Sequence, residues 1–357
     1  MKEESTASET TAKGLFRRGP RFLAGGMDPN DFLKVINQVN SWDDWVSGVE
    51  AYADERKKLA EEALASERFL SAGEYFIESG IYYHFAVLGY FEDMDRKYKI
   101  KKKSVETYAL GLNYIAPPIK RLDIPYDGIT MSAHLRLPQH AGNGPFPVVF
   151  LLPGVDSTKE EYFVFSGVLL KRGLATIAFE GLGQGETRFF RAMTADYEQS
   201  FSTALDFIQN IQEIDTNRTA VYGRSMGGHL APRVAAHDRR VRAVVSAGGI
   251  YEMTYWDGLS PITKDNFRHA WGYENFDDAR EHAMNMSLEG IIPKITCPFL
   301  IVHSKNDKNF PAAGAARMKN EAQCETELLI YEEGSHVADN IRYKYQRYVA
   351  DWLKKQL

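Results

Sequence analysis

Hydrophobic positions divide the chain into a helical part and a part in which strands alternate with helices. From residue 28 to about 111, apolar residues such as Phe32, Val35 and Ile36 recur at three- and four-residue spacing, which predicts amphipathic helices. No strand-like alternation occurs there, and Pro117-Pro118 ends the pattern. The N-terminal part is therefore predicted to be all-helical.

The apolar runs after residue 118 are nearly continuous, which is typical of parallel strands that are buried on both faces of a sheet. They lie at 147–152, 175–179, 219–222, 241–246, 298–302 and 327–330, after two further strands at 119–125 and 129–137. We therefore predict a flexible, polar tail over residues 1–26, a helical domain over 27–118, and an α/β domain over 119–357.

One of these strands runs directly into a glycine-rich motif that contains a serine. Thr219–Tyr222 is followed by Gly223-Arg224-Ser225-Met226-Gly227-Gly228 and then by the helical stretch 230–236. Gly-x-Ser-x-Gly between a strand and a helix is typical of a nucleophile elbow, where the serine sits on a tight, strained turn. The alternative is a chance match in a loop, and we favour the elbow because partners for the serine are found elsewhere in the chain.

A serine hydroxyl becomes a good nucleophile only when a base removes its proton. His336 follows the strand at 327–330, and Asp307 follows the strand at 298–302. The carboxyl ends of parallel strands meet at one edge of a sheet, so Ser225, His336 and Asp307 are expected to lie together. Competing candidates are His303 for the base, and Glu332 and Glu333 for the acid; we expect the first to be a packing residue and the other two to be solvated.

Two backbone N–H groups are needed to bind the oxyanion that would form at such a serine. Met226, directly after the serine, is one candidate, and Val155 in the loop Pro153-Gly154-Val155-Asp156 is the other. The pattern of this four-residue loop is equally typical of a simple turn between a strand and a helix. The run Gly181-x-Gly183-x-Gly185 lacks the spacing of a dinucleotide-binding motif, and we interpret it as a tight turn beside the site.

Composition narrows the class of protein. The 357 residues are 44% hydrophobic and carry a net charge of −5, which favours neither nucleic acid nor an anionic membrane as partner. The two cysteines form no disulfide framework or metal set, and the sequence contains neither a transmembrane-length apolar run nor a signal-peptide core. We expect a cytoplasmic protein without a metal or cofactor.

These features together resemble the α/β-hydrolase superfamily, in which the residues occur in the order Ser, Asp, His. A closer resemblance covers nearly the whole chain and is carried by Leu152–Glu161, Phe179–Glu186 and Gly248-Gly249 with Tyr255-Trp256-Asp257. In these segments the sequence resembles a family that includes 2,6-dihydroxypseudooxynicotine hydrolase, fungal polyketide-shortening hydrolases and FrsA-like esterases. This implies an α/β-hydrolase fold, with a mostly parallel, doubly wound sheet and a helical N-terminal domain as a lid.

The resemblance implies a serine hydrolase with Ser225, Asp307 and His336 as catalytic residues. The first two kinds of relative cleave a carbon–carbon bond beside a ketone, so the expected substrate is an aryl ketone or a 1,3-dicarbonyl compound. The reaction is expected to proceed through an acyl-enzyme intermediate. A carboxylesterase acting on a small or aromatic ester is the alternative, and a non-catalytic binding protein on a hydrolase scaffold is the third. The carbon–carbon reaction also calls for an extra carboxylate, with Glu252 and Asp257 as candidates.

Further candidates concern the substrate and partners. The substrate-binding candidates are Tyr82, Tyr83, His84, Glu252, Tyr255, Trp256 and Asp257. The three in the helical domain read equally as helix core. A small-molecule substrate is expected, with no nucleic acid or membrane partner, and the resemblance suggests a homodimer.

Overall fold

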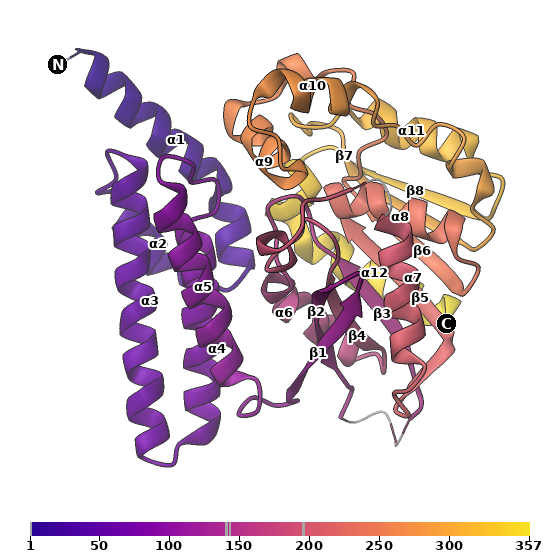
Figure 1. Ribbon diagram of the computed structural model, residues 1–357, viewed down its shortest axis with the longest axis horizontal. Coiled ribbons are helices and arrows are strands. Elements are labelled where there is room, and N and C mark those ends of the chain that lie inside the picture. The colour runs from indigo at the N-terminus through magenta and orange to yellow at the C-terminus, as the bar shows by residue number, and fades with distance from the viewer. Residues whose placement is uncertain (1, 140–141, 143, 195–196) are drawn as a thin grey trace. The chain divides into compact units, whose positions relative to one another are not determined.

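The chain divides into two units, Met1–Lys120 and Arg121–Leu357, and the described part of the first is built from helices up to Gly111. The computed structural model describes residues 2–139, 142, 144–194 and 197–357, with side chains from residue 11 onward. The helices of the first unit are α1 (Lys2–Ala24), α2 (Pro29–Ile36), α3 (Trp42–Ala65), α4 (Phe69–Ala86) and α5 (Met94–Gly111) (Figure 1).

The helices of this unit pack closely because small residues line their contacts. A Cβ added at Gly80 of α4 would lie 2.6 Å from the Cβ of Tyr108 on α5. The hydroxyl of Ser104 donates to the Gly80 carbonyl at 2.7 Å, and the hydroxyl of Ser79 donates to the Ala53 carbonyl of α3 at 2.7 Å. Close backbone approach thus holds α4 between its two neighbours.

Helix α1 corrects the prediction of a flexible tail over residues 1–26. Leu15 and Phe22, seven residues apart on one face, are both fully buried. The Phe22 ring stacks on Trp45 with centroids 5.1 Å apart. The polar composition of the first fourteen residues masked this apolar stripe, and tertiary packing on α2 and α3 decides the conformation.

The second unit contains an eight-stranded sheet with the order β1-β2-β4-β3-β5-β6-β7-β8. Strand β2 runs antiparallel to β4, and the strands from β4 to β8 are parallel. The predicted mostly parallel sheet is confirmed. The strands are β1 (Ile119–Tyr126), β2 (Ile129–Arg136), β3 (Phe146–Leu152), β4 (Ala175–Glu180), β5 (Ile214–Arg224), β6 (Val241–Ala247), β7 (Phe299–Ser304) and β8 (Thr326–Tyr331).

Helices cover both faces of this sheet (Figure 1). Along β3, Val148 and Phe150 contribute to one core and Val149 and Leu151 to the other, as the two-residue period of a strand requires. The first core contains α7 (Tyr197–Ile208), α8 (Met226–His237), α9 (Pro261–Trp271), α10 (Phe276–Met284) and α11 (Ala312–Glu321); the second contains α6 (Phe163–Leu170) and α12 (Arg342–Gln356). Short 3-10 helices are η1 (Lys159–Tyr162), η2 (Thr187–Phe189), η3 (Trp256–Gly258), η4 (Ile292–Lys294) and η5 (His336–Ile341).

The turn from β5 into α8 is packed closely against neighbouring backbone. A Cβ added at Gly223 would overlap the carbonyl oxygen of Gly227, and a Cβ added at Gly227 would overlap the carbonyl oxygen of Leu152 on β3. Both obstacles are backbone atoms, which cannot rotate away as a side chain would. Only glycine fits at these two positions.

Replacing Gly227 with alanine is expected to lower the free energy of unfolding of the α/β unit by about 3 kcal/mol or more, because the added methyl group meets backbone. Gly167→Ala on α6 is the matched control, since no atom lies within 4 Å of its Cβ position. That variant is expected to be unchanged or stabilised by up to about 1 kcal/mol. Equal denaturant midpoints for the two variants would contradict the close-packing argument.

Candidate active site

Ser225 stands at the end of β5 in a backbone conformation that non-glycine residues rarely adopt, with φ 56° and ψ −119°. Its N–H donates to the Ala247 carbonyl of β6 at 2.9 Å, and its own carbonyl accepts from the His229 N–H at 3.2 Å. Hydrogen bonds of both its N–H and its carbonyl group therefore maintain this strained backbone conformation. Such strain is typical of a residue whose side chain is presented for function.

The structure brings Ser225, His336 and Asp307 together at the carboxyl edge of the sheet. His336 Nε2 lies 2.9 Å from Ser225 Oγ, and His336 Nδ1 lies 2.7 Å from Asp307 Oδ2. The side chain of Asp307 is fully buried, whereas 26% of the His336 side chain remains exposed. A buried carboxylate, a ring and a hydroxyl therefore form one hydrogen-bonded row.

The hydrogen bonds of Asp307 define the proton positions in this row. Its Oδ1 accepts from the backbone N–H groups of Asn309 at 2.8 Å and Phe310 at 3.1 Å. Burial alone raises the pKa of the Asp307 carboxyl, but the charge and hydrogen bond of His336 outweigh it, so that the pKa lies below its ordinary value. An ionised Asp307 accepts from Nδ1–H of His336, which leaves Nε2 free to accept from the Ser225 hydroxyl.

The histidine segment is tied to the serine turn by a buried ion pair. Arg224, directly before Ser225, donates to Asp339 Oδ1 at 3.0 Å and Oδ2 at 2.9 Å, and Arg342 Nε donates to the same carboxylate at 2.8 Å. Asp339 lies in η5, which begins at His336. The sequence analysis missed this pair, because the two residues are 115 positions apart and nothing in the sequence couples them.

Val337 and Ala338 adopt left-handed backbone conformations, with φ of 50° and 53°. Two successive non-glycine residues in this region are unusual. Gly248, at the end of β6, makes room for them, because a Cβ there would lie 2.6 Å from Val337 Cγ1. The histidine thus rests on an irregular segment that surrounding contacts hold in place.

The loop after β3 lies against the serine. A Cβ added at Gly154 would lie 3.3 Å from Ser225 Cβ, so the backbone at Gly154 approaches the serine turn closely. Within the described part of the chain, the N–H groups of Val155 and Met226 have no backbone acceptor. These are the two groups that the sequence analysis proposed as donors to an oxyanion.

The turn after β4 braces this loop. Gln184 Nε2 donates to the Pro153 carbonyl at 2.6 Å, while its Oε1 accepts from the hydroxyl of Tyr197 at 2.8 Å. Arg188 donates to the Val155 carbonyl through Nη2 and to the Gly183 carbonyl through Nε at 2.8 Å. The glycine-rich run was therefore interpreted correctly as a turn beside the site, but the bracing side chains within it were missed.

A buried polar cluster backs the same region. Lys159 Nζ lies 2.7 Å from Glu160 Oε1, 3.2 Å from Glu180 Oε2 and 2.8 Å from Glu186 Oε1. Glu180 also accepts from the backbone N–H groups of Lys159 and Glu186, at 2.8 and 3.0 Å. One cation shared by three carboxylates joins the segment after β3 to the turn after β4.

Of the predicted substrate-binding residues in the α/β unit, Tyr255 lies nearest to the row. Its ring packs edge-on against Phe310 with centroids 6.2 Å apart, and Phe310 packs against the His336 ring at 5.1 Å. Burial raises the pKa of the Tyr255 hydroxyl well above its ordinary value, and the nearby charge of Asp307 adds to the effect. An aromatic surface thus extends from the histidine.

The three other substrate-binding candidates in this unit contact residues outside the row. Trp256 is 2% exposed and stacks on Trp271 at 6.1 Å, so it belongs to the core. Glu252 forms an ion pair with Arg317 at 3.2 Å, and Asp257 forms one with Arg280 at 2.8 Å. Among the contacts of the described residues, neither carboxylate reaches Ser225 or His336, because arginines on neighbouring segments pair with both.

The tyrosine candidates in the helical unit serve its own core. The Tyr82 hydroxyl donates to Asp31 Oδ2 at 2.8 Å and accepts from the Asp28 N–H at 2.8 Å. The Tyr83 hydroxyl donates to Asp54. His84 is 2% exposed, with its ring 5.4 Å from that of Phe85. The helix-core interpretation of these three residues is the one that their surroundings support.

The competing base and acid candidates do not join the row. His303 is buried, and its Nδ1 accepts from the Ser304 N–H at 2.9 Å. Glu332 pairs with Lys305 at 2.7 Å, and Glu333 pairs with Lys344 on the surface.

Over the described residues, no group of three or more His, Cys, Asp or Glu side chains is arranged to hold a metal ion. The helices within the same residues include none with the length and apolar character needed to span a bilayer.

Removing the negative charge of Asp339 by substitution with asparagine is expected to lower the free energy of unfolding by about 3–5 kcal/mol, because Arg224 and Arg342 then lose a buried partner. The control is Asp351→Asn, whose carboxylate pairs with Arg172 and is 68% exposed. It should cost less than about 1 kcal/mol. Denaturant unfolding measures both, and a loss for Asp339→Asn no larger than the control would contradict the anchoring role.

Two family models match this chain. The model described as "Esterase FrsA-like" matches residues 44–258, and the model described as "Prolyl oligopeptidase family" matches residues 169–357. Each covers more than half of the chain. The two overlap across β5 and the serine turn.

Individual relatives extend the match further. The chain is 31% identical to 2,6-dihydropseudooxynicotine hydrolase of Paenarthrobacter nicotinovorans over 339 residues, which are 93% of this chain and 90% of that protein. It is 30% identical to 20-hydroxy-prefusarin hydrolase FUS2 of Gibberella moniliformis over 305 residues, 73% of this chain and 71% of that protein. The crystal structure of 2,6-dihydroxy-pseudo-oxynicotine hydrolase superposes with a TM-score of 0.88 at 29% identity, covering 95% of both chains. The chain therefore belongs to the FrsA-like esterase family of α/β hydrolases and is a hydrolytic enzyme.

Proposed function

We propose that this enzyme uses Ser225 as a nucleophile to cleave a carbon–carbon bond next to a ketone. The observation that carries the proposal is the continuous hydrogen-bonded row from Ser225 Oγ through His336 to Asp307, at 2.9 and 2.7 Å. The substrate class rests on the similarity to 2,6-dihydropseudooxynicotine hydrolase over 93% of the chain. The expected substrate is an aryl ketone or a 1,3-dicarbonyl compound.

In the first step, His336 Nε2 takes the proton of the Ser225 hydroxyl as Oγ attacks the ketone carbon. The imidazole becomes positively charged, and the ionised Asp307 stabilises it through Nδ1–H. The buried position of Asp307 strengthens this interaction, since little water screens it. The carbonyl oxygen becomes an oxyanion.

The N–H groups of Met226 and Val155 bind this oxyanion. Met226 is the first residue of α8, so its N–H is one of the groups that a helix leaves without an internal partner. The carbonyls of Pro153 and Val155 are held by Gln184 and Arg188, which stabilises the orientation of the intervening peptide units. Donors positioned before the reaction cost no reorganisation when charge develops.

Collapse of the intermediate breaks the bond between the carbonyl carbon and its neighbouring carbon. The electron pair of that bond leaves with the departing carbon, which takes the proton from His336 Nε2. The acyl group remains on Ser225 Oγ as an ester. Water then attacks the ester with His336 as the base, releasing a carboxylic acid and restoring the hydroxyl, so that ketone and water give one acid and one C–H product.

Such a departing carbon must carry its charge as an enolate or on an electron-rich ring. The aromatic surface of Phe310 and Tyr255 beside His336 supports a substrate with an aromatic or conjugated group. A small-molecule substrate, a lid over residues 27–118, a catalytic domain from residue 119, a cytoplasmic location and a homodimer remain predictions.

A carboxylesterase is the second candidate, and the match of residues 44–258 to the FrsA-like esterase model favours it. The same row of residues would serve, because an alkoxide leaving group accepts the proton from His336 in the same way. No additional carboxylate is required. This candidate gains weight from the ion pairs that hold Glu252 and Asp257 with arginines.

The test compares hydrolysis of 1-phenyl-1,3-butanedione with that of 4-nitrophenyl acetate in ¹⁸O-labelled water. The proposal expects a carboxylic acid containing one labelled oxygen from the diketone, and a loss of at least about 10³-fold in kcat for Ser225→Ala. Ser66→Ala, at an exposed position after α3, should retain full activity.

Turnover of the ester alone would favour the carboxylesterase. If the wild type hydrolyses either compound and Ser225→Ala hydrolyses it equally fast, the role of Ser225 is contradicted for both substrate classes. Unfolding midpoints of the two serine variants are compared beforehand, so that a loss of fold is not read as a loss of chemistry.

A further inference from the structure

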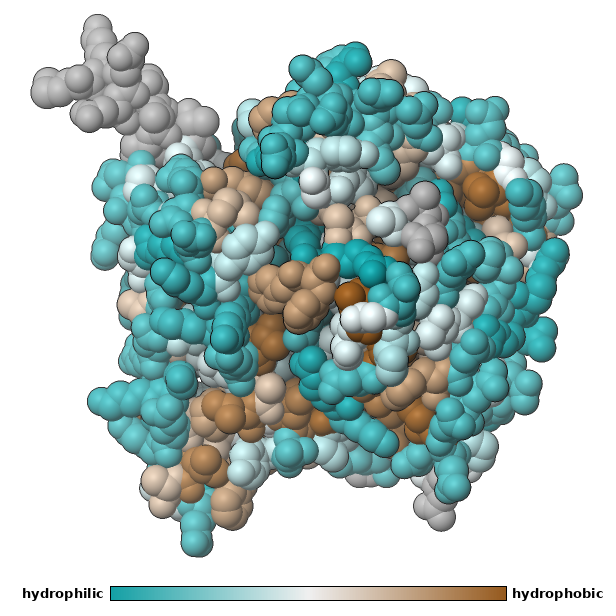
Figure 2. All heavy atoms as spheres, in the orientation of Figure 1, coloured by the Kyte–Doolittle hydropathy of each residue, from teal (hydrophilic) through white to brown (hydrophobic). Residues whose placement is uncertain are grey.

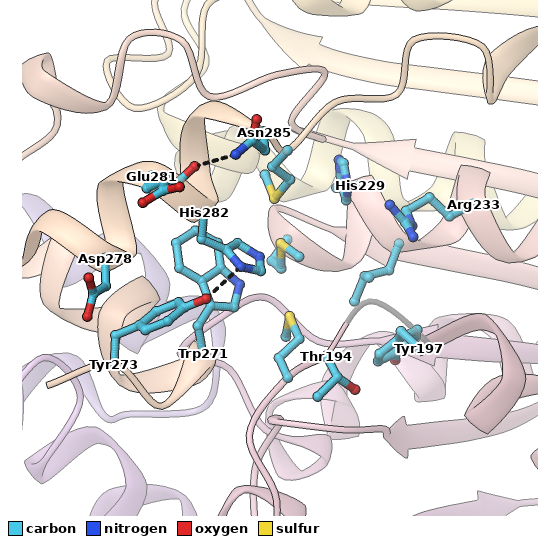
Figure 3. Close-up of a pocket in the computed structure, with 14 residues that line it drawn as sticks. Thr194, Tyr197, His229, Arg233, Trp271, Tyr273, Asp278, Glu281, His282 and Asn285 are labelled. Carbon is cyan, nitrogen blue, oxygen red and sulfur yellow. Dashed lines mark hydrogen bonds between the residues drawn. The ribbon is translucent and has the colours of Figure 1, made fainter.

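A cavity of about 540 Å³ lies in the α/β unit beside the helix that begins after Ser225. Its volume is within the range of small-molecule sites. The residues that line it come from α8, from positions 193–194, from the first residue of α7, from the end of α9 with the turn after it, and from α10 with the two residues after it (Figure 3). Ser225, Asp307 and His336 are not among them.

Helix α8 supplies one wall through residues that recur every three or four positions: Met226, His229, Leu230 and Arg233. Met226 and Leu230 are each 3% exposed. Across the cavity, Met193, Trp271 and Met286 are also buried. Methionine adapts to varied apolar shapes, so the inner part of the cavity suits an aromatic or aliphatic body.

His229 and Tyr197 are polar residues of this inner part, and each is 1% exposed. The Tyr197 hydroxyl donates to Gln184 Oε1. His229 Nδ1 lies 2.9 Å from the Ile250 carbonyl oxygen, which only accepts, so Nδ1 carries the proton. Burial, with a smaller effect from the charge of Arg233, lowers the pKa of His229 to about 3. The ring is therefore neutral, and Nε2 is an acceptor for which the described residues provide no donor.

The outer part of the cavity is polar. Asp278, Glu281 and Asn285 are exposed, and Figure 2 shows the outward surface over α10 as mostly hydrophilic. The His282 ring packs against Trp271 in a tilted arrangement, with centroids 4.4 Å apart, and it is hydrogen-bonded to the Tyr273 hydroxyl at 3.1 Å. On the opposite wall, Glu198 pairs with Arg233. Asp278 accepts from Asn275 Nδ2 at 2.8 Å, and among the described residues neither it nor Glu281 forms an ion pair with a cation. Two carboxylates at the entrance whose charge is not neutralised disfavour an anionic ligand.

We propose that this cavity binds a neutral, apolar molecule that carries a hydroxyl group, and that His229 Nε2 accepts the hydrogen bond from that hydroxyl. A ligand that fills the apolar volume excludes water from His229 Nε2, and an acceptor left without a partner in this way is costly. A ligand that fills the volume and donates one hydrogen bond avoids that cost. A ligand of the same shape without a donor does not.

The cavity is distinct from the hydrolytic row but shares an element with it. Met226 contributes its side chain to the cavity wall and its N–H to the nucleophile turn. Binding in the cavity does not depend on the reaction at Ser225, so the two proposals are tested separately.

The test measures binding of 2-naphthol and 2-methoxynaphthalene to the full-length protein by calorimetry. The two probes share the ring system, but only the first donates a hydrogen bond. 2-Naphthol is expected to bind at least about fivefold more tightly. In the His229→Leu variant the two probes should bind with about equal affinity. In the Met286→Trp variant, whose indole ring fills the cavity, neither probe should bind.

A parallel titration uses protein whose Ser225 has been capped with a fluorophosphonate, and the naphthol affinity should be retained. Equal affinity of the two probes for the wild type, survival of binding in Met286→Trp, or loss of binding on capping would each overturn the proposal. If His229→Leu does not fold, the Met286→Trp and capped proteins still decide whether the cavity is the site.

Discussion

The strained backbone of Ser225 is the constraint on which the site depends. A left-handed serine between a strand and a helix is possible here because Gly223, Gly227 and the β3 carbonyls approach more closely than any side chain would allow. The hydrogen bond from the Ser225 N–H to Ala247 fixes the turn against β6. The parallel order β3-β5-β6-β7-β8 then decides which loops can reach the hydroxyl.

Around this turn, the chemistry depends on contacts between segments that are distant in the chain. The ion pair between Arg224 and Asp339 joins the serine turn to the histidine segment. Gln184 and Arg188 hold the loop after β3 from the other side. The Ser225 hydroxyl, the His336 ring and the loop that contains Val155 are thus each supported by a separate polar contact.

Much of this arrangement could be predicted, because apolar runs mark buried parallel strands and the ends of such strands meet at one edge. That reasoning selected Ser225, Asp307 and His336, which the structure brings within hydrogen-bond distance. It failed where tertiary contacts override local composition: α1 is held by two buried apolar side chains in a polar stretch, and Trp256 turns into the core. Glu252 and Asp257 could not be assigned from sequence, because their arginine partners are 65 and 23 residues away.

The central claim is that this geometry makes Ser225 the activated nucleophile of the enzyme. The most direct test is mass spectrometry of the protein after reaction with a fluorophosphonate, followed over time in the wild type and in His336→Ala. The account predicts one adduct, on the peptide that contains Ser225, forming at least about 10³-fold more slowly without the imidazole. No adduct at Ser225, or equal rates in the two proteins, would contradict it.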